Sequence, residues 1–270
     1  MAEQKEQAFR LLPEWKIQQA GQSLIISGGA DARYEVDLET PAPSFFATLP
    51  SDRPFVRRAL DGRDERVLEQ LITAEIIVPV LKTSPVLKVA IMGDREGVVL
   101  PASKNLVVVG ARQPYDCALI VRVNATYAAL LEGLDYPSIT KPHLLVDLAF
   151  HHTASIGPLV FPGETACIAC LQGRVATRWG DETPPQLPKV ADDYSALVWE
   201  LVATELSRIS RGDTSLTNKT IAWNFQDRAV RENQLLKVPL CPICTQNTID
   251  HSGALALPWR NNESTANTVR

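Results

Sequence analysis

Residues 157–171 read GPLVFPGETACIACL, and a second short stretch, residues 238–244, reads VPLCPIC. Each contains a Cys-x-x-Cys pair, Cys167 with Cys170 and Cys241 with Cys244. The two-residue gap lets both sulfurs of a pair bind one metal ion, and two pairs supply the four thiolates of a tetrahedral zinc site. We therefore predict one zinc ion bound by these four cysteines.

The predicted zinc is structural, because four thiolates leave no ligand position for water or substrate. Because 70 residues separate the two pairs, the zinc ion would connect two distant segments of the chain. A redox-active Cys-x-x-Cys is the alternative, but it does not need a second copy. The fifth cysteine, Cys117, lies in an apolar run and is predicted to be an inert buried thiol.

Composition places the chain among globular proteins. It has 270 residues, 45% of them hydrophobic and 21% charged, enough for one large domain or two ordinary ones. The net charge of −4 and the absence of a basic stripe argue against a nucleic-acid partner. No apolar run approaches the length of a membrane helix, and the first residues lack the apolar core of a signal peptide. We expect a cytoplasmic protein without a membrane partner.

Residues 1–82 are predicted to form a separate unit. Polar and apolar residues alternate strictly over Arg33–Leu38, which indicates a half-buried strand. Strands and helices expected around it suggest a winged helix-turn-helix. The segment Leu12–Ile17 leads into the expected strands, which are Leu24–Ser27, Arg33–Leu38 and Glu75–Val80. The expected helices are Phe45–Leu49, Arg53–Leu60 and Asp64–Ala74.

A peptide suits this unit better than DNA does. Residues 64–71 carry three acids against one base, a poor surface for a groove lined with phosphates. An extended peptide can instead add to the edge of the strand and rest against the third helix. The predicted peptide-binding residues are Arg33, Tyr34, Glu35, Val36, Asp37 and Leu38 of the strand and Val67, Gln70 and Leu71 of the helix.

Residues 83–250 have an α/β pattern, and residues 251–270 are predicted to be a flexible tail. Four short apolar runs are typical of buried parallel strands. They are Val86–Ile91, Leu106–Val109, Ala118–Val123 and Leu144–Leu148. Helices are expected over Ala125–Leu134 and Asp192–Ile209, a strand over Thr220–Phe225 followed by a return strand, and a loop over Gly157–Gly163.

The two cysteine segments resemble those of the ThiF/MoeB and ubiquitin-activating-enzyme superfamily. More closely, they resemble the zinc-binding partner subunits of azole-forming, YcaO-dependent peptide cyclodehydratases. The N-terminal unit resembles, in pattern only, the leader-peptide recognition element of those proteins. The resemblance implies a degenerate Rossmann-like domain that binds the leader of a ribosomally made precursor peptide. A YcaO-type partner would use ATP to cyclise Cys, Ser or Thr residues of the peptide core. An FMN-dependent dehydrogenase is a further implied partner, and a homodimer is the implied assembly.

One departure from the family bears on ATP. Adenylating members carry a Gly-rich loop after their first Rossmann strand, but here Met92–Gly97 has two glycines at a different spacing and two acids. We expect no ATP on this chain and no catalytic residue. The alternative is a ThiF-like enzyme that adenylates a peptide carboxylate.

Three other groups leave two interpretations open. His151 and His152 suggest acid–base chemistry or a simple surface pair. Asp147 follows an apolar strand, where α/β enzymes place functional acids, but a hydrogen-bonded strand-end acid fits equally. Arg174 and Arg178, one helical turn apart, fit either a carboxylate-binding site or a solvated helix face.

Overall fold

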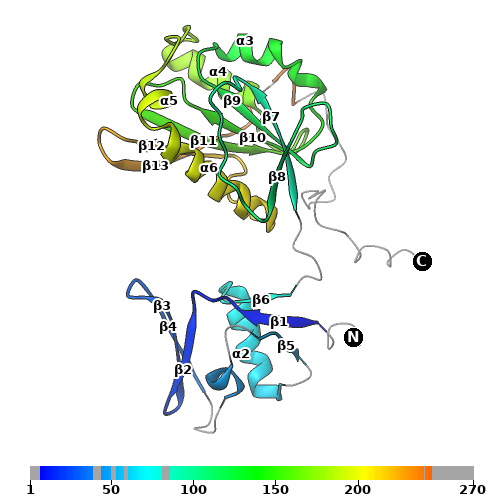
Figure 1. Cartoon of the computed structure of the whole chain (residues 1–270), viewed down its shortest axis with the longest axis vertical. Coiled ribbons are helices and arrows are strands. Elements are labelled where there is room, and N and C mark those ends of the chain that lie inside the picture. The colour runs from blue at the N-terminus through cyan, green and yellow to red at the C-terminus, as the bar shows by residue number, and fades with distance from the viewer. Residues whose placement is uncertain are drawn as a thin grey trace, which may run out of the picture. The chain divides into compact units, whose positions relative to one another are not determined.

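The computed structural model describes residues 7–38, 44–49, 53–57, 60–80, 86–239 and 241–244. The chain divides into two compact units, Met1–Ser84 and Pro85–Arg270 (Figure 1). The division falls two residues after the boundary expected from the sequence. The tail expected over residues 251–270 lies outside the described residues.

The N-terminal unit holds two small antiparallel sheets around one core. In the first sheet β1 (Ala8–Leu11) lies between β5 (Phe55–Val56) and β6 (Ile77–Pro79). The second is a meander of β2 (Lys16–Ala20), β3 (Ser23–Gly29) and β4 (Ala32–Asp37). The meander and the helix α2 (Gly62–Thr73) bury apolar side chains in a shared core that includes Leu24, Ile26 and Leu68.

The expected winged helix-turn-helix is not confirmed. In the described part of this unit α2 is the only α-helix, and Phe45–Thr48 forms a short 3-10 helix, η1. The helix expected over Arg53–Leu60 is wrong, because Phe55 and Val56 form β5 and pair with β1. The apolar residues Phe55 and Val56 are compatible with a two-residue strand and also with one turn of a helix. Only the pairing with β1 decides that they form a strand.

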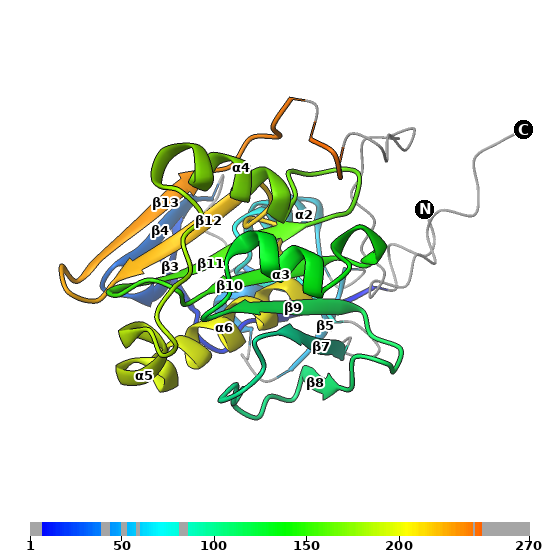
Figure 2. The same cartoon turned by 90° about the horizontal axis from the view of Figure 1, so that it is seen from above.

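A seven-stranded mixed sheet forms the centre of the second unit, in the order β13-β12-β11-β10-β9-β7-β8. The parallel part comprises β7 (Leu87–Gly93), β8 (Leu106–Val109), β9 (Cys117–Arg122) and β10 (His143–Asp147). The antiparallel part comprises β11 (Thr153–Val160), β12 (Lys219–Asn224) and β13 (Ala229–Gln234). Figure 2 shows β12 and β13 as a hairpin at one end of the sheet and β7 and β8 at the other. The predicted α/β class and the four parallel strands are confirmed.

Helices cover the two faces of this sheet (Figure 1). Along β10, Leu144 and Val146 belong to the core under α5 (Lys189–Asp193) and α6 (Ser195–Ser210), whereas Leu145 belongs to the opposite core. That second core is covered by α3 (Tyr127–Gly133), the 3-10 helix η3 (Tyr136–Ser138) and α4 (Ile168–Trp179). Alternation of side chains along a strand explains why β9 and β10 are buried at every position.

Two expectations for this unit are corrected. Gly157 and Pro158 lie inside β11 rather than in a loop, joined by a cis peptide bond. Gly157 has a φ of 102°, and a Cβ there would lie 2.4 Å from the carbonyl oxygen of Lys219, so glycine permits the close approach of β12. The helix expected over Asp192–Ile209 is two helices, α5 and α6, that meet at Tyr194.

No helix among the described residues combines the length and the apolar character needed to cross a bilayer.

Candidate functional site

The four predicted cysteines lie together in one buried cluster. Cys167 is the N-cap residue of α4 and Cys170 lies in its first turn, while Cys241 and Cys244 belong to a segment that follows β13. All four sulfurs lie within 4.8 Å of one another.

The sulfur geometry fits a metal ion. Sγ–Sγ distances are 3.8 Å for Cys167–Cys170, 3.7 Å for Cys167–Cys241 and 3.5 Å for Cys170–Cys244. A tetrahedron with metal–sulfur bonds of about 2.3 Å has edges of about 3.8 Å. A disulfide would need about 2.05 Å, and all four cysteines are free thiols. The cluster can therefore hold one metal ion with four sulfur ligands.

Electrostatics also favour a cation among these sulfurs. Burial and the neighbouring sulfurs raise the pKa of Cys167, and burial with hydrogen bonds to Cys170 and Cys241 raises the pKa of Cys244 to about 12. Burial opposes ionisation of Cys241 as well, but backbone N–H groups of Cys244 and Ile243 lower its pKa below the usual value. The backbone N–H of Val238 lies 3.3 Å from Cys170 Sγ and donates to it. Four thiolates so close together need a positive charge, and a bound metal ion displaces their protons.

A buried tyrosine and histidine support the first pair of cysteines, a feature that the sequence analysis missed. The Tyr136 hydroxyl accepts a hydrogen bond from the N–H of Ile168 at 3.0 Å and lies 2.7 Å from His143 Nε2. His143 Nδ1 lies 2.9 Å from the carbonyl oxygen of Lys141, which can only accept, so Nδ1 carries the proton and Tyr136 donates to Nε2. Both side chains are buried. No spacing in the sequence signals this contact, because Tyr136 and Ile168 are 32 residues apart.

The carboxyl ends of β7 and β9 form the switch point of the sheet, where α/β proteins commonly bind ligands. In this protein hydrogen bonds within the chain connect the two strand ends at that point. The carboxylate of Asp94, just after β7, accepts hydrogen bonds from the N–H groups of Val123 at 2.7 Å and Asn124 at 3.1 Å, just after β9. Residues 94–105, all of them described, contain no helix whose N-terminus could face a phosphate.

Both carboxylate oxygens of Asp147 accept hydrogen bonds from neighbouring groups. Arg122 Nη1 lies 3.0 Å from both carboxylate oxygens, and the Tyr127 hydroxyl and the Ala149 N–H also donate to them. The Arg122 guanidinium also lies 4.0 Å from the centroid of the Tyr127 ring. Both charges are buried and paired with each other, so of the two interpretations of Asp147 the structure favours the hydrogen-bonded strand-end acid.

In the N-terminal unit, β4 is an edge strand of the meander in the described part of the chain. Tyr34 and Val36 pair with Ile26 and Leu24 of β3, so they share the face that points to the core, and Leu38 is buried at its end. Tyr34 is 50% exposed and its ring lies 5.7 Å from that of Trp15. The alternate residues of β4 point to the other face and are exposed: Arg33, Glu35 and Asp37.

Of the three helix residues predicted to bind peptide, Gln70 is exposed, but Val67 and Leu71 are buried. Their side chains lie in the core, so they stabilise the unit instead of offering a surface. Gln70 and its neighbours Glu69, Thr73 and Ala74 line a shallow depression on the outer side of α2.

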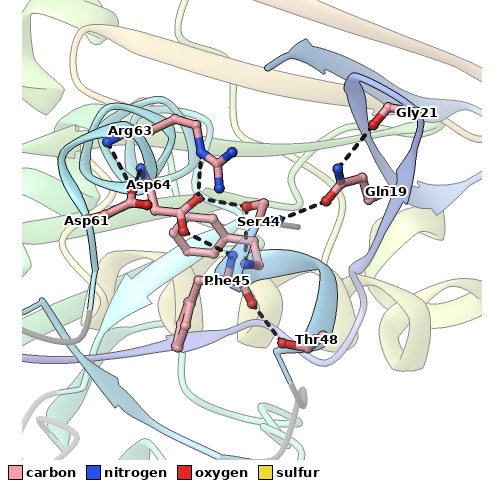
Figure 3. A network of polar contacts seen from close by, with 9 residues as sticks. Gln19, Gly21, Ser44, Phe45, Thr48, Asp61, Arg63 and Asp64 are labelled. Atoms are coloured by element: carbon pink, nitrogen blue, oxygen red, sulfur yellow. Dashed lines mark hydrogen bonds and ion pairs between the residues drawn. The ribbon is translucent and has the colours of Figure 1, made fainter. Parts of the chain in front are cut away.

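A polar network fixes the start of α2 to the meander (Figure 3). The buried Asp64 carboxylate accepts from the Ser44 hydroxyl at 2.8 Å and from the Phe45 N–H at 3.0 Å. The Ser44 N–H in turn donates to Gln19 Oε1 of β2 at 2.8 Å. Asp61 caps the helix by accepting from the N–H of Asp64. Asp64, one of the three acids counted on this helix, is therefore buried inside the unit and does not contribute to its acidic surface.

The remaining candidates do not form a site with the cysteines in the described residues. His151 and His152 contact each other ring to ring, with centroids 4.3 Å apart, after the end of β10. Arg174 donates to the carbonyl oxygen of Leu236, which joins α4 to the segment before the second cysteine pair. Arg178 lies over the ring of the exposed Trp179.

The fold is similar to that of several solved structures. A heterocyclase in complex with substrate and cofactor has a TM-score of 0.56 and 12% identity, over 88% of this chain and 39% of that chain. The heterocyclase TruD has a TM-score of 0.52 and 15% identity, over 88% of this chain and 43% of that one. Escherichia coli MccB with ATP has a TM-score of 0.51 and 14% identity, over 88% of this chain and 99% of MccB.

These similarities concern the fold. The chain spans about two fifths of the two heterocyclases and nearly all of MccB. No protein-family model and no curated protein sequence matches the chain.

Proposed function

We propose that this protein binds the leader of a ribosomally made precursor peptide and presents the peptide core to a YcaO-type, ATP-dependent cyclodehydratase. The observation that carries this proposal is the position of β4 at the edge of its sheet, as far as the structure describes the chain, in a unit separate from the cysteine-containing unit. An extended peptide can add to such an edge through main-chain hydrogen bonds. Because Tyr34, Val36 and Leu38 lie on the core side, the backbone supplies the pairing, and Arg33, Glu35 and Asp37 are the side chains beside the peptide.

In this proposal the metal is zinc and its role is structural. The four sulfurs connect the start of α4 to the segment after β13, 74 residues apart in sequence for the pairs Cys167–Cys241 and Cys170–Cys244. Ions that prefer oxygen ligands, such as magnesium and calcium, do not suit a site of four sulfurs, whereas zinc does.

The proposed division of labour is the one that the family resemblance implies, in which a YcaO-type partner forms the rings. The two heterocyclases of similar fold are longer, and this chain spans about two fifths of each. An FMN-dependent dehydrogenase would then oxidise azolines to azoles.

The proposal is tested by titrating a fluorescent leader peptide, taken from the precursor encoded beside this gene, with the full chain. We expect saturable 1:1 binding that a scrambled leader does not reproduce. Adding the YcaO protein and ATP should then remove one water from the precursor for each ring formed. A folded, metal-loaded chain that does not bind the leader would refute the proposal.

The second candidate is an enzyme that adenylates a peptide carboxylate. The similarity to MccB, solved with ATP and matched over nearly its whole length, favours it. The Asp94 carboxylate, which already occupies the N–H groups beyond β9, disfavours it, because a phosphate would have to displace it against charge repulsion. Peptide-dependent exchange of pyrophosphate into ATP by this chain alone would decide for the enzyme.

A further inference from the structure

The exposed face of the N-terminal meander changes sign along β4. Lys16 of β2 and Arg33 of β4 both pair with Ser27 of β3, so the two cations share the end of the face where β4 begins. Glu35 and Asp37 follow on the same face, toward the end of the strand. The charge therefore runs from positive to negative in the direction of β4.

The unit does not neutralise these charges itself. Among the residues that the structure describes, Arg33, Glu35 and Asp37 form no ion pair. The Ser23 hydroxyl donates to the Asp37 carboxylate at 3.3 Å, and a neutral donor leaves the charge of the carboxylate in place. Charges on an edge strand hinder pairing with strands of the wrong charge and admit a strand whose charges are complementary.

The other face of β4 is apolar, which determines where an added strand can carry its charges. Tyr34 and Val36 lie on that face, and the Tyr34 ring contacts the ring of Trp15. Gly28 permits this arrangement, because a Cβ at Gly28 would lie only 3.0 Å from the Trp15 ring. Side chains alternate between the two faces of a strand. Every second residue of an added peptide therefore meets the apolar face, and the residues between them meet the charged face.

We propose that β4 selects the leader by the order of its charges, in an antiparallel pairing. The leader then places a basic residue opposite Asp37, a basic residue opposite Glu35 and an acidic residue opposite Arg33. Read from its N-terminus, the pairing segment is basic, apolar, basic, apolar, acidic. This inference rests on the proposed function and names the class of leader that the function requires.

The antiparallel direction continues the pairing already present in the meander, and antiparallel pairs are slightly more stable per residue than parallel ones. Opposite charges directly across such a pair stabilise it, and like charges destabilise it. A leader with the reverse order, acidic, apolar, basic, apolar, basic, would meet a like charge at both Asp37 and Arg33. The order of the charges, and not only their number, therefore decides the affinity.

The test begins with charge reversal in the metal-loaded full chain, titrated against the fluorescent leader. Glu35→Lys should weaken leader binding by roughly fivefold or more, because a lysine then faces a basic residue of the leader. Glu14→Lys changes the net charge of the chain by the same amount at an exposed position in the turn before β2. This control should bind the leader as the wild type does.

Reversing single charges of the leader then locates each contact. One basic leader residue changed to Glu should restore the affinity of Glu35→Lys. The leader residue that restores Asp37→Lys should lie two positions closer to the leader N-terminus. An acidic leader residue changed to Lys, two positions on the C-terminal side, should restore Arg33→Glu. A variant that has merely lost its fold cannot show restoration at three alternate positions.

The outcomes separate this inference from the leader-binding function. If the wild type binds the leader but no leader change restores the variants, the charge order is wrong and leader binding still stands. Restoration in the opposite order along the leader would overturn the antiparallel register. A wild-type chain that does not bind the leader would refute the proposed function and this inference with it.

Discussion

The hydroxyl of Tyr136 caps the helix whose own N-cap residue is Cys167. It accepts the N–H of Ile168, the first residue of α4, at 3.0 Å. An N-cap side chain commonly accepts such backbone N–H groups, but the Cys167 side chain makes no capping hydrogen bond and faces the other sulfurs. Tyr136 therefore supplies from outside the helix the acceptor that the Cys167 side chain, turned toward the other sulfurs, does not supply.

Removing this hydroxyl should weaken both the fold and the metal site. Tyr136→Phe leaves the N–H of Ile168 and Nε2 of His143 without their partner in a buried place, which costs about 1–3 kcal/mol in the free energy of unfolding. Because groups that orient ligands affect affinity, we expect the metal affinity to fall by roughly tenfold or more. Competition with a chromophoric chelator measures the affinity, and urea unfolding measures the stability.

Tyr115→Phe is the control for that experiment, since Tyr115 is a partly buried tyrosine in the same unit. Its metal affinity should match that of the wild type. Equal affinities for Tyr136→Phe and the wild type would show that the hydroxyl does not support the cysteines.

The cysteine cluster itself predicts about one zinc ion per chain. Cys167→Ser and Cys241→Ser should each lose the metal and most of the soluble protein, because thiolate binding is coupled to folding. Cys117→Ala is the matched control: burial raises the Cys117 pKa to about 12, and Cys117 is not among the clustered sulfurs. Elemental analysis of the purified variants measures the metal. Full zinc content in both serine variants would contradict a four-sulfur site.

The buried, neutral His143 should make the folded protein less stable in acid. Burial lowers its pKa from 6.5 to about 4, so the folded protein holds the neutral ring. A group with a depressed folded pKa contributes stability above its unfolded pKa and loses it as pH falls through the folded pKa. The wild type should therefore lose about 3 kcal/mol between pH 6.5 and pH 4 from this group.

A glutamine isolates that effect from acid release of the metal. His143→Gln keeps an acceptor for Tyr136 but does not titrate. We expect the stability difference between the wild type and His143→Gln, measured by urea unfolding, to shift against the wild type as pH falls from 6.5 to about 4. A pH-independent difference would mean that His143 titrates alike in the folded and unfolded chains.

Glu35 tests whether peptide adds to β4 through its backbone. Glu35→Pro removes a main-chain N–H and disturbs the edge, so leader affinity should fall by roughly tenfold or more. Glu35→Ala removes the same side chain but keeps the N–H, and it should bind within a few-fold of the wild type. Unchanged zinc content shows that the second unit is intact in both variants. An equal loss of leader affinity in the two variants would show that the peptide contacts the Glu35 carboxylate instead of the backbone.

Much of this protein could be predicted from local sequence. The Cys-x-x-Cys spacing determined which residues form the cluster, and runs such as Leu144–Leu148 determined the buried parallel strands. Both signals are local: a knuckle needs only two intervening residues, and a strand buried on both faces is apolar at every position.

Tertiary structure alone decided the rest, because it depends on contacts between residues far apart in sequence. Phe55 and Val56 became a strand only because β1 lies beside them. Pairing across β3 and helix packing decided that Val36 points to the core side and that Val67 lies inside. The same holds for the Tyr136 hydroxyl that accepts the N–H of Ile168 and for the Asp94 bridge between β7 and β9. The sequence by itself determined which four sulfurs gather; the fold determined what supports them and which surfaces remain free.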